Sequence, residues 1–305
     1  MANHVLSPKI VRELLNRKNL APRKSLGQNF LIDANIQQKI VAAAEILPRD
    51  LVLEIGPGLG ALTESLLERA GQVIAVEYDR GLFAVLQENF SSQPRIQLLN
   101  QDFLGTDLVR LLEVYRKEEY HYKVVANLPY YITTPVIFKL LESGISWESM
   151  VFMVQKEVAD RICATPGSKD YGSLTVMLNF YGRSEKVCNA PKTVFYPVPQ
   201  VDSVVVKITT HVYAGEEAVR QREMAPFLQQ VVQTAFGQRR KTILNALTSL
   251  ALTPGPRDSN KEDWASRLHK LGISPMRRGE TLSLQEFVDI TNEFYLWSKT
   301  KGPGV

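Results

Sequence analysis

Short apolar runs alternate with stretches of helical periodicity between residues 51 and 210. The apolar runs predict strands at Leu51–Ile55, Val73–Val76, Ile96–Leu99, Val124–Ala126, Met150–Val154, Leu174–Phe180 and Ser203–Ile208. Stretches between the first four runs, such as Leu59–Arg69 and Arg80–Phe90, are long enough for crossover helices. Strands that alternate with helices are typical of a parallel sheet covered by helices on both faces. The pattern therefore predicts a doubly wound, Rossmann-like α/β domain.

The last two apolar runs are connected differently from the others. Between them lies a proline-rich loop, from Pro191 to Pro199, that is too short and too rich in proline for a helix. We therefore expect Leu174–Phe180 and Ser203–Ile208 to form an antiparallel hairpin. Its final strand would be inserted into an otherwise parallel sheet.

After about Thr210 the periodicity of the chain becomes helical. Helices are predicted at Met224–Phe236, Lys241–Leu250, Lys261–Leu271 and Ser283–Ser298. Ser283 and Glu286 have the Ser-x-x-Glu spacing of a capping box, and Thr253–Pro256 is predicted to be a loop. We therefore divide the chain into a basic N-terminal arm (residues 1–24), a Rossmann-like domain (25–210) and a small all-α domain (211–305).

The composition is that of a globular protein with enough apolar material for a core. Of 305 residues, 45% are hydrophobic and 22% are charged. Cys163 and Cys188 form neither a Cys-x-x-Cys motif nor a ligand-spaced cluster with histidines, so we expect no disulfide framework and no metal site. The sequence lacks an apolar run of about 18 residues and an apolar secretory core, which predicts a cytoplasmic protein.

Basic residues are concentrated in two places. The net charge of +4 permits nucleic-acid binding without requiring it. One cluster, Arg17, Lys18, Arg23 and Lys24, precedes the first domain, and the other, Arg239–Lys241, begins a predicted helix. Each cluster is either a solvated face or a phosphate-binding surface. The basic N-terminus also has the composition of a transit peptide, although an exposed basic arm explains it equally well.

A glycine-rich turn, Glu54–Gly60, follows the first predicted strand and precedes a helix. Glycine lets the backbone approach a ligand there, and the helix N-terminus can meet a carboxylate or phosphate. Glu77 ends the next strand and can accept hydrogen bonds from two ribose hydroxyls, while Asp102 follows the third strand and can accept from an adenine amine. The spacing from Gly56 onward also fits the dinucleotide fingerprint, so the turn alone leaves both NAD and S-adenosylmethionine open.

The tetrapeptide Asn127-Leu128-Pro129-Tyr130 closes the fourth strand and favours S-adenosylmethionine. The exocyclic amine of adenine is a poor nucleophile because its lone pair is delocalised into the ring. A carboxamide, a carbonyl beside proline and an aromatic face can hold and polarise such an amine. Together with the glycine-rich turn, the tetrapeptide indicates methyl transfer to a planar amino nitrogen.

As a set, these motifs resemble the KsgA (RsmA) family of ribosomal RNA adenine dimethyltransferases. The matching segments, in family order over about residues 22–298, are Lys24–Leu31, Glu54–Gly60, Glu77–Asp79, Asp102–Phe103, Asn127–Tyr130 and Val194–Ser203. The resemblance implies a class I S-adenosylmethionine methyltransferase fold with a late antiparallel strand. It also implies N6,N6-dimethylation of two adjacent adenosines near the 3′ end of small-subunit (16S) rRNA in the 30S particle, and a role in ribosome biogenesis.

The same resemblance implies which residues bind the cofactor. Asn29 and Leu31 would line the methionine and sulfonium end of S-adenosylmethionine. Gly56 would approach its amino-acid part, Glu77 would hold the ribose and Asp102 the adenine. The product would be S-adenosylhomocysteine.

The resemblance also implies how the amine reacts. Asn127 would lie between the cofactor and the target base. Its side-chain oxygen and the backbone carbonyl of Leu128 or Pro129 would accept hydrogen bonds from the N6 amine and aim the lone pair at the methyl group. No general base is required, because the methylated cationic nitrogen loses its proton readily.

Base stacking and RNA binding complete the implied site. Tyr130 would stack on the target base, with Phe195 or Phe30 on its other face. Phosphate contacts from lysine and arginine would make RNA affinity depend on salt. The main candidates for these contacts are Arg239, Arg240 and Lys241, followed by Arg23 and Lys24 and then by Lys156 and Arg161.

Three other functions are compatible with part of the sequence. Erythromycin-resistance methyltransferases share the Asn-Leu-Pro-Tyr pattern but modify large-subunit rRNA; the Phe195–Ser203 stretch and the helical C-terminal region look more like the small-subunit family. A non-catalytic assembly factor would have no reason to keep Glu77, Asp102, Asn127 and Tyr130. An NAD-dependent oxidoreductase would need a hydride-transfer histidine or lysine constellation, which the sequence does not show. We expect a monomer, because no coiled-coil or repeat pattern suggests otherwise.

Overall fold

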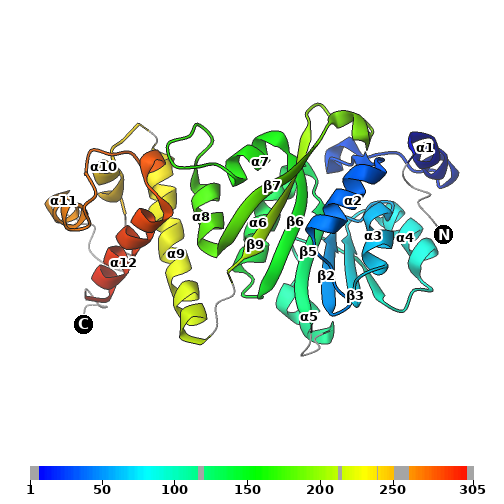
Figure 1. Cartoon of the computed structure of the whole chain (residues 1–305), viewed down its shortest axis with the longest axis horizontal. Coiled ribbons are helices and arrows are strands. Elements are labelled where there is room, and N and C mark those ends of the chain that lie inside the picture. The colour runs from blue at the N-terminus through cyan, green and yellow to red at the C-terminus, as the bar shows by residue number, and fades with distance from the viewer. Residues whose placement is uncertain (1–6, 116–119, 212–214, 239, 251–260, 301–305) are drawn as a thin grey trace. The chain divides into compact units, whose positions relative to one another are not determined.

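The computed structural model describes residues 7–115, 120–211, 215–238, 240–250 and 261–300. These residues belong to two compact units (Figure 1). The first comprises Met1–Ala159 with Arg183–His211, and the second comprises Asp160–Gly182 with Val212–Val305. The second unit thus takes in a segment that precedes the last strands of the sheet.

The first unit contains most of the strands. Its helices are α1 (Pro8–Arg17), α2 (Ala34–Ala43), α3 (Ala61–Leu67), α4 (Arg80–Phe90), α5 (Leu108–Tyr115) and α6 (Thr133–Glu142), with short 3₁₀ turns η1 (Lys24–Leu26), η2 (Tyr130–Ile132) and η3 (Lys192–Val194). Its strands are β1 (Phe30–Leu31), β2 (Asp50–Ile55), β3 (Gln72–Glu77), β4 (Ile96–Asn100), β5 (His121–Asn127), β6 (Trp147–Gln155), β7 (Gly182–Ala190), β8 (Phe195–Tyr196) and β9 (Ser203–Thr210).

Within the described residues the main sheet has seven strands in the order β4-β3-β2-β5-β6-β9-β7. The strands from β4 to β6 are parallel, whereas β9 runs antiparallel to β6, with Met150 opposite Ile208. The predicted insertion of the final strand is therefore confirmed. Because the strand order reverses between β2 and β5, the carboxyl ends of these strands frame the crevice where ligands bind in open α/β sheets.

The central strands β2, β3, β5 and β6 are largely buried, as expected for a parallel sheet under helices. Every residue of β2 is buried. One layer of the core joins α2 and α3 to the sheet through side chains that alternate along the strands: Val52, Val73, Val125, Val151 and Val205. Figure 1 shows α2 and α3 along the strands of this unit. This packing fixes the strand ends, which carry the predicted site.

Six of the predicted strands are confirmed, but the prediction for Leu174–Phe180 is wrong. These residues lie in helix α8 (Ser173–Tyr181), in which Leu174 to Leu178 are all buried. A short apolar run that is buried on all sides has no polar face, so its periodicity cannot separate helix from strand. The strand beside β9 is instead β7, a largely exposed edge strand. Its polar sequence gave no signal of a buried strand.

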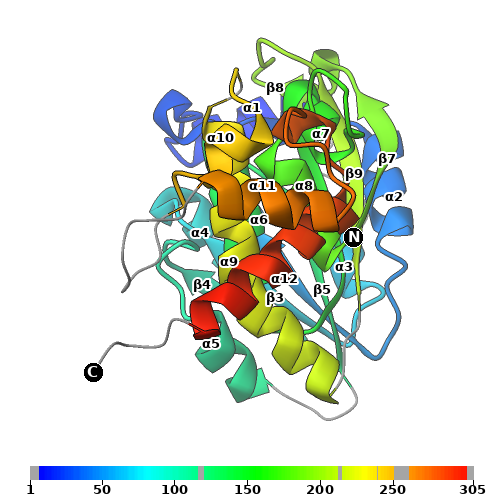
Figure 2. The same ribbon diagram turned by 90° about the vertical axis from the view of Figure 1, so that its left-hand side faces the viewer.

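The second unit is helical. It contains α8, α9 (Gly215–Gly237), α10 (Ile243–Leu247), α11 (Lys261–Lys270), η4 (Gly279–Thr281) and α12 (Leu284–Thr300), and α7 (Lys156–Ile162) runs into it. Figures 1 and 2 both show α9 and α12 side by side, where Phe227 packs against Phe294 with ring centroids 5.8 Å apart. The predicted capping box is confirmed, because the Ser283 N–H donates to Glu286 (2.8 Å) and the Glu286 N–H donates to Ser283 Oγ (3.2 Å).

The described helices differ from the predicted ones mainly at their ends. α9 begins at Gly215, nine residues before the predicted Met224, and α10 is shorter than Lys241–Leu250. The loop predicted at Thr253–Pro256 lies outside the described residues. Among the helices that the structure describes, none is both long and apolar enough to cross a membrane. The predicted boundaries at residues 24 and 210 remain predictions.

Candidate functional site

The carboxyl ends of four neighbouring strands surround a cavity of about 440 Å³. Gly56 follows β2, Glu77 ends β3, Asp102 follows β4 and Asn127 ends β5, and all four line the cavity. Since these strands are adjacent in the sheet, residues far apart in the sequence meet at one edge. The cavity lies at the point where the strand order reverses.

The segment Ser25–Leu31 forms the opposite wall of this cavity. Leu31 pairs with Phe195 in a two-stranded antiparallel sheet, β1 with β8. The glycine-rich turn packs against this wall: Gly58 has φ +62°, and a Cβ there would lie 3.3 Å from the Phe30 ring. A larger residue at position 58 would therefore strain the backbone and press on the wall.

Glu77 is held in one orientation by two backbone groups. Its Oε1 accepts from the Asp79 N–H (2.8 Å) and its Oε2 from the Gly58 N–H (3.0 Å). Burial raises the pKa of Glu77 to about 7, although these hydrogen bonds oppose the rise. A carboxylate offers about four lone-pair sites, so each oxygen can still accept from a ligand hydroxyl.

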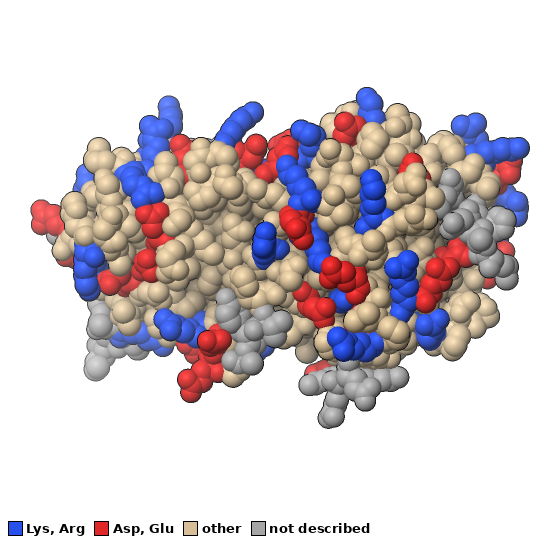
Figure 3. Space-filling model, viewed as in Figure 1, with Lys and Arg blue, Asp and Glu red and all other residues tan. Residues whose placement is uncertain are grey.

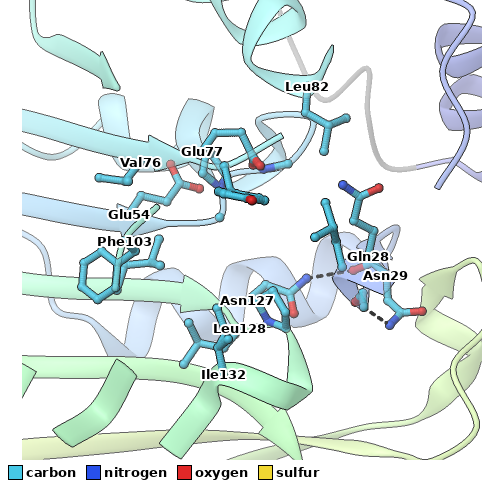
Figure 4. Close-up of a pocket in the computed structure, with 18 of the residues that line it drawn as sticks. Gln28, Asn29, Glu54, Val76, Glu77, Leu82, Phe103, Asn127, Leu128 and Ile132 are labelled. Atoms are coloured by element: carbon cyan, nitrogen blue, oxygen red, sulfur yellow. Dashed lines mark hydrogen bonds between the residues drawn. The ribbon is translucent and has the colours of Figure 1, made fainter. Parts of the chain in front are cut away.

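Glu54 is a second buried carboxyl group in the same cavity. Its Oε2 accepts from Thr63 Oγ1 (2.7 Å), but its buried Oε1 has no hydrogen-bond partner. Burial raises the pKa of Glu54 to about 8, with a further contribution from the charge of Glu77. Figure 4 shows both carboxyl groups on one side of the pocket. An unpartnered buried oxygen here fits a ligand that carries a donor or a positive charge.

Asn127 lines the same cavity as the two carboxyl groups, and its amide is held in one orientation. Its Nδ2 donates to the Asn29 backbone carbonyl (3.0 Å), and Asn29 Nδ2 in turn donates to the Gly27 carbonyl (3.0 Å) (Figure 4). A backbone carbonyl can only accept, so the amide nitrogen of Asn127 must face Asn29. Asn127 Oδ1 is therefore the atom left to accept a hydrogen bond in the cavity.

The residues after Asn127 turn sharply into η2. Leu128 is almost fully buried, and Pro129 lines the cavity. The Pro129 carbonyl accepts from the Ile132 N–H (3.2 Å) and from Thr133 Oγ1 (3.3 Å), so it is already engaged within the turn.

The aromatic residues of the predicted site lie in different places. Tyr131, 59% exposed, lines the cavity. Its neighbour Tyr130 lies outside the lining and bonds through its hydroxyl to Ser203 Oγ (2.9 Å); burial raises the pKa of Tyr130. Phe195 is 1% exposed and packs in the core, whereas Phe30 lines the cavity.

Asp102 lies at the exposed rim of the cavity. Its Oδ1 accepts from the Leu104 N–H (2.9 Å), which fixes the turn after β4. Sequence reasoning assigned no role to Glu54, Gln28 or Tyr131, which also line the cavity. Glu54 could have been noticed, because a carboxylate at the end of a buried apolar strand needs a partner.

The predicted RNA-binding residues are only partly described. Arg240 and Lys241 are exposed in the turn before α10, while Arg239 and the side chain of Lys24 lie outside the described residues. Arg23 forms an ion pair with Asp79 (3.2 Å). Figure 3 shows lysine and arginine side chains gathered over α1, where Lys9, Arg12 and Arg17 are exposed.

A possible metal-ligating group lies at the other edge of the sheet. Among the described residues, Asp50, His121 and Glu148 bring one ligand atom each within 4.8 Å of one another. The Lys123 ammonium lies among them, 3.0 Å from Asp50 and 3.2 Å from Glu148. Because this ammonium already supplies positive charge, we assign no metal to the group.

Comparison with known proteins gives consistent matches over most of the chain. A family model described as ribosomal RNA adenine dimethylase matches residues 19–292. Proteins named ribosomal RNA small subunit methyltransferase A are 46% identical in Pelotomaculum thermopropionicum, over 95% of this chain and 97% of that protein, and 48% identical in Moorella thermoacetica, over 94% and 97%.

Two solved structures resemble this chain in the same way. A dimethyladenosine transferase from Plasmodium falciparum has a TM-score of 0.73 and 27% identity, covering 88% of this chain and 98% of that one. The 23S rRNA methyltransferase ErmE has a TM-score of 0.60 and 26% identity, covering 86% and 98%. The fold of the first unit is a Rossmann-like methyltransferase fold.

Proposed function

Because this chain belongs to the ribosomal RNA adenine dimethylase family and is an rRNA adenine dimethyltransferase, we propose that its substrate is small-subunit rRNA. We propose that it dimethylates the N6 amines of two adjacent adenosines near the 3′ end of that RNA, within the 30S particle. The curated relatives, named for the small subunit, support this choice over the large-subunit substrate named for ErmE.

The cofactor is proposed to be S-adenosylmethionine, which when bound supplies an electrophilic methyl group on a sulfonium. The cavity fits it in three respects. Glu77 keeps lone pairs for two ribose hydroxyls, and the glycine turn admits the amino-acid part near Gly56. The unpartnered Oε1 of Glu54 suits a cationic ligand. Asn29, Leu31 and Asp102 complete the proposed cofactor contacts.

The orientation of Asn127 carries the proposal for catalysis. With its Nδ2 committed to the Asn29 carbonyl, Asn127 presents an acceptor to a target amine in the cavity. We assign the second acceptor to the Leu128 carbonyl, because the Pro129 carbonyl is already bonded within its turn. Two acceptors would hold the N6 hydrogens in place and turn the nitrogen lone pair toward the methyl group.

We propose Tyr130, which is partly buried, as the residue that stacks on the target base, and Tyr131 offers an exposed ring that lines the cavity. Both Phe195 and Phe30 are buried, but only Phe30 lines the cavity, so Phe30 is the better placed partner. Extruded bases are commonly read by stacking between such side chains.

RNA binding is proposed for Arg240 and Lys241 in the second unit, together with Arg239, and for the basic N-terminal residues including Arg23 and Lys24. Lysine and arginine side chains bind phosphates and make affinity fall as salt rises. We further propose that the chain is divided into three structural regions, with boundaries near residues 24 and 210. The protein is proposed to be a monomer in the cytoplasm and to take part in small-subunit biogenesis.

The test uses labelled S-adenosylmethionine with small subunits, large subunits and naked rRNA, each from cells that lack the modification. After digestion to nucleosides, we expect labelled dimethyladenosine from small subunits only. Asn127→Ala should abolish the label, and Asn16→Ala, an exposed asparagine of α1, should not.

Two other results would change the proposal. Label in large-subunit rRNA would mean that the substrate is large-subunit rRNA, as named for ErmE. Tight binding to small subunits without any label would mean that the chain acts as an assembly factor.

A further inference from the structure

The wall formed by Ser25–Leu31 is held to the rest of the first unit by a polar junction as well as by packing. Gln28 uses both ends of its amide in this junction. Its Oε1 accepts from the Arg23 N–H (2.8 Å), and its Nε2 donates to Asp79 Oδ2 (3.2 Å). The Arg23 guanidinium binds the same carboxylate oxygen at 3.2 Å. Arg23, which precedes the wall, and Gln28, which belongs to it, thus both contact Asp79 Oδ2.

Asp79 is also tied to the opposite side of the cavity. It is 4% exposed, and its Oδ1 caps α4 by accepting from the N–H groups of Gly81 (2.8 Å) and Leu82 (3.2 Å). Its own N–H donates to Glu77 Oε1 (2.8 Å). Asp79 therefore stands between Glu77, on the sheet edge, and the wall that faces it.

From these contacts we propose that Asp79 is a positioning residue that latches the wall Ser25–Leu31 over the bound cofactor. Its bonds to Arg23 and Gln28 keep the wall closed, and its bond to Glu77 links this closure to the proposed ribose contact. The inference rests on the proposed cofactor site. Arg23, which the sequence analysis assigned to RNA, thereby acquires a role within the cofactor site.

A second ion pair, between the end of α1 and α4, provides a comparison outside the wall. Lys18 contacts Glu88 on α4, but Glu88 is 62% exposed, and no described hydrogen bond links this pair to the wall. A solvent-exposed pair contributes little, whereas hydrogen bonds to a buried carboxylate contribute more. Loss of the Asp79 contacts should therefore loosen the wall, and loss of the Glu88 contact should not.

The decisive variant is Asp79→Asn. Asparagine still caps a helix, so α4 keeps its N-cap. The amide nitrogen now faces two donors, Arg23 and Gln28, and can accept from neither. We expect amide hydrogen exchange at residues 25–31 of the ligand-free protein to become about five- to tenfold faster, since contacts of this kind are each worth about a factor of ten or less. Glu88→Gln should leave it unchanged.

The dissociation rate of S-adenosylhomocysteine provides the second measurement. It should rise by about the same factor in Asp79→Asn, by a smaller factor in Arg23→Gln, which removes only one of the two contacts to Asp79, and by less than about twofold in Glu88→Gln. In the Asp79→Asn background, Arg23→Gln should add nothing further, because its partner is already lost. Thermal unfolding of all variants shows whether a general loss of stability accompanies the change.

The proposed role of Asp79 would be overturned if amide exchange at residues 25–31 were unchanged in Asp79→Asn. It would also be overturned if Arg23→Gln increased the dissociation rate in the Asp79→Asn background by the same factor as in the wild type. Faster exchange throughout the first unit would mean that Asp79 acts only through the stability of α4, and would also overturn it. If the wild-type protein binds no S-adenosylhomocysteine, the proposed cofactor is wrong. The exchange measurement on the ligand-free protein still decides whether Asp79 holds the wall.

Discussion

The two edges of the same sheet differ in whether a buried carboxyl group has a cationic partner within the protein. At the amino edge, Asp50 pairs at 3.0 Å with Lys123, which is itself 1% exposed. At the carboxyl edge, Glu54 and Glu77 share a cavity with no cation among the described lining residues, and the pKa values of both are raised, to about 8 and about 7. The first edge supplies its own counter-charge, while the second leaves that charge to a ligand.

The largest effect is expected at the amino edge. Lys123→Met should lower the free energy of unfolding by about 3–5 kcal/mol, because it leaves Asp50 buried without its cation. Urea denaturation measures the loss. Adding Asp50→Asn to this variant should restore part of it. The control is Lys207→Met, which breaks a pair with the 73% exposed Glu45 and should cost less than about 1 kcal/mol from the ion pair. Equal losses in both variants would remove the contrast between the edges.

At the carboxyl edge, replacement of the acid should stabilise the ligand-free protein at high pH. The folded pKa of Glu54, about 8, lies above its ordinary value of 4.5, so the folded state binds the extra proton and stability falls as pH rises between these values. Glu54→Gln should remove this fall. The free energy of unfolding of the variant, relative to that of the wild type, should therefore increase by about 2–4 kcal/mol from pH 5 to pH 8. Urea titrations at both pH values test it. A constant difference would show that Glu54 is already ionised in the folded protein.

Cofactor binding should favour loss of the protons from Glu54 and Glu77 at this edge of the sheet. A cationic ligand favours the ionised carboxyl groups, so affinity for S-adenosylmethionine, which carries the sulfonium, should rise from pH 6 to pH 8, by up to about tenfold per pH unit. Calorimetry in two buffers with different ionisation enthalpies should detect released protons. Glu54→Gln should flatten the dependence, leaving the smaller contribution of Glu77. An affinity independent of pH would mean that the ligand's charge does not meet these carboxyl groups.

The smallest effect is expected where a partner at the amino edge is exposed. His121 contacts Glu148, and both side chains are more than 40% exposed, at 44% and 42%. His121→Asn should change the free energy of unfolding by less than about 1 kcal/mol at pH 7. Urea denaturation beside Lys123→Met gives a direct comparison. A loss as large as that of Lys123→Met would mean that the exposed His121–Glu148 contact stabilises the protein as much as the buried Asp50–Lys123 pair does.

The strand ends could be predicted from sequence because each follows a buried apolar run. Val73–Val76 and Val124–Ala126 lie in the strands β3 and β5, so the sequence alone predicts that Glu77 and Asn127 lie at one edge of the sheet. The polar edge strand β7 and the helix α8 could not be separated by pattern, since one lacks an apolar face and the other lacks a polar one.

Contacts that join distant segments could not be predicted from spacing. The Gln28–Asp79 hydrogen bond and the orientation of Asn127 by Asn29 depend on how the N-terminal segment packs. That segment contains α1, whose Val11 and Leu15 are buried beside Leu82 and Phe30. From the sequence, this cluster of basic residues was predicted to be an exposed arm or a phosphate-binding surface. Two of its members, Lys18 and Arg23, are ion-paired on the surface of the first unit.

The pairing of β1 with β8 has a consequence for the order in which the protein is made. Phe30 lies opposite Tyr196, so the cavity wall finds its partner strand only after most of the first unit has left the ribosome. At typical elongation rates of about 5–20 residues per second, the early segment waits roughly 10–30 s for this partner. A nascent chain that stops short of Phe195 therefore carries the glycine turn and the acidic residues but no completed cofactor pocket.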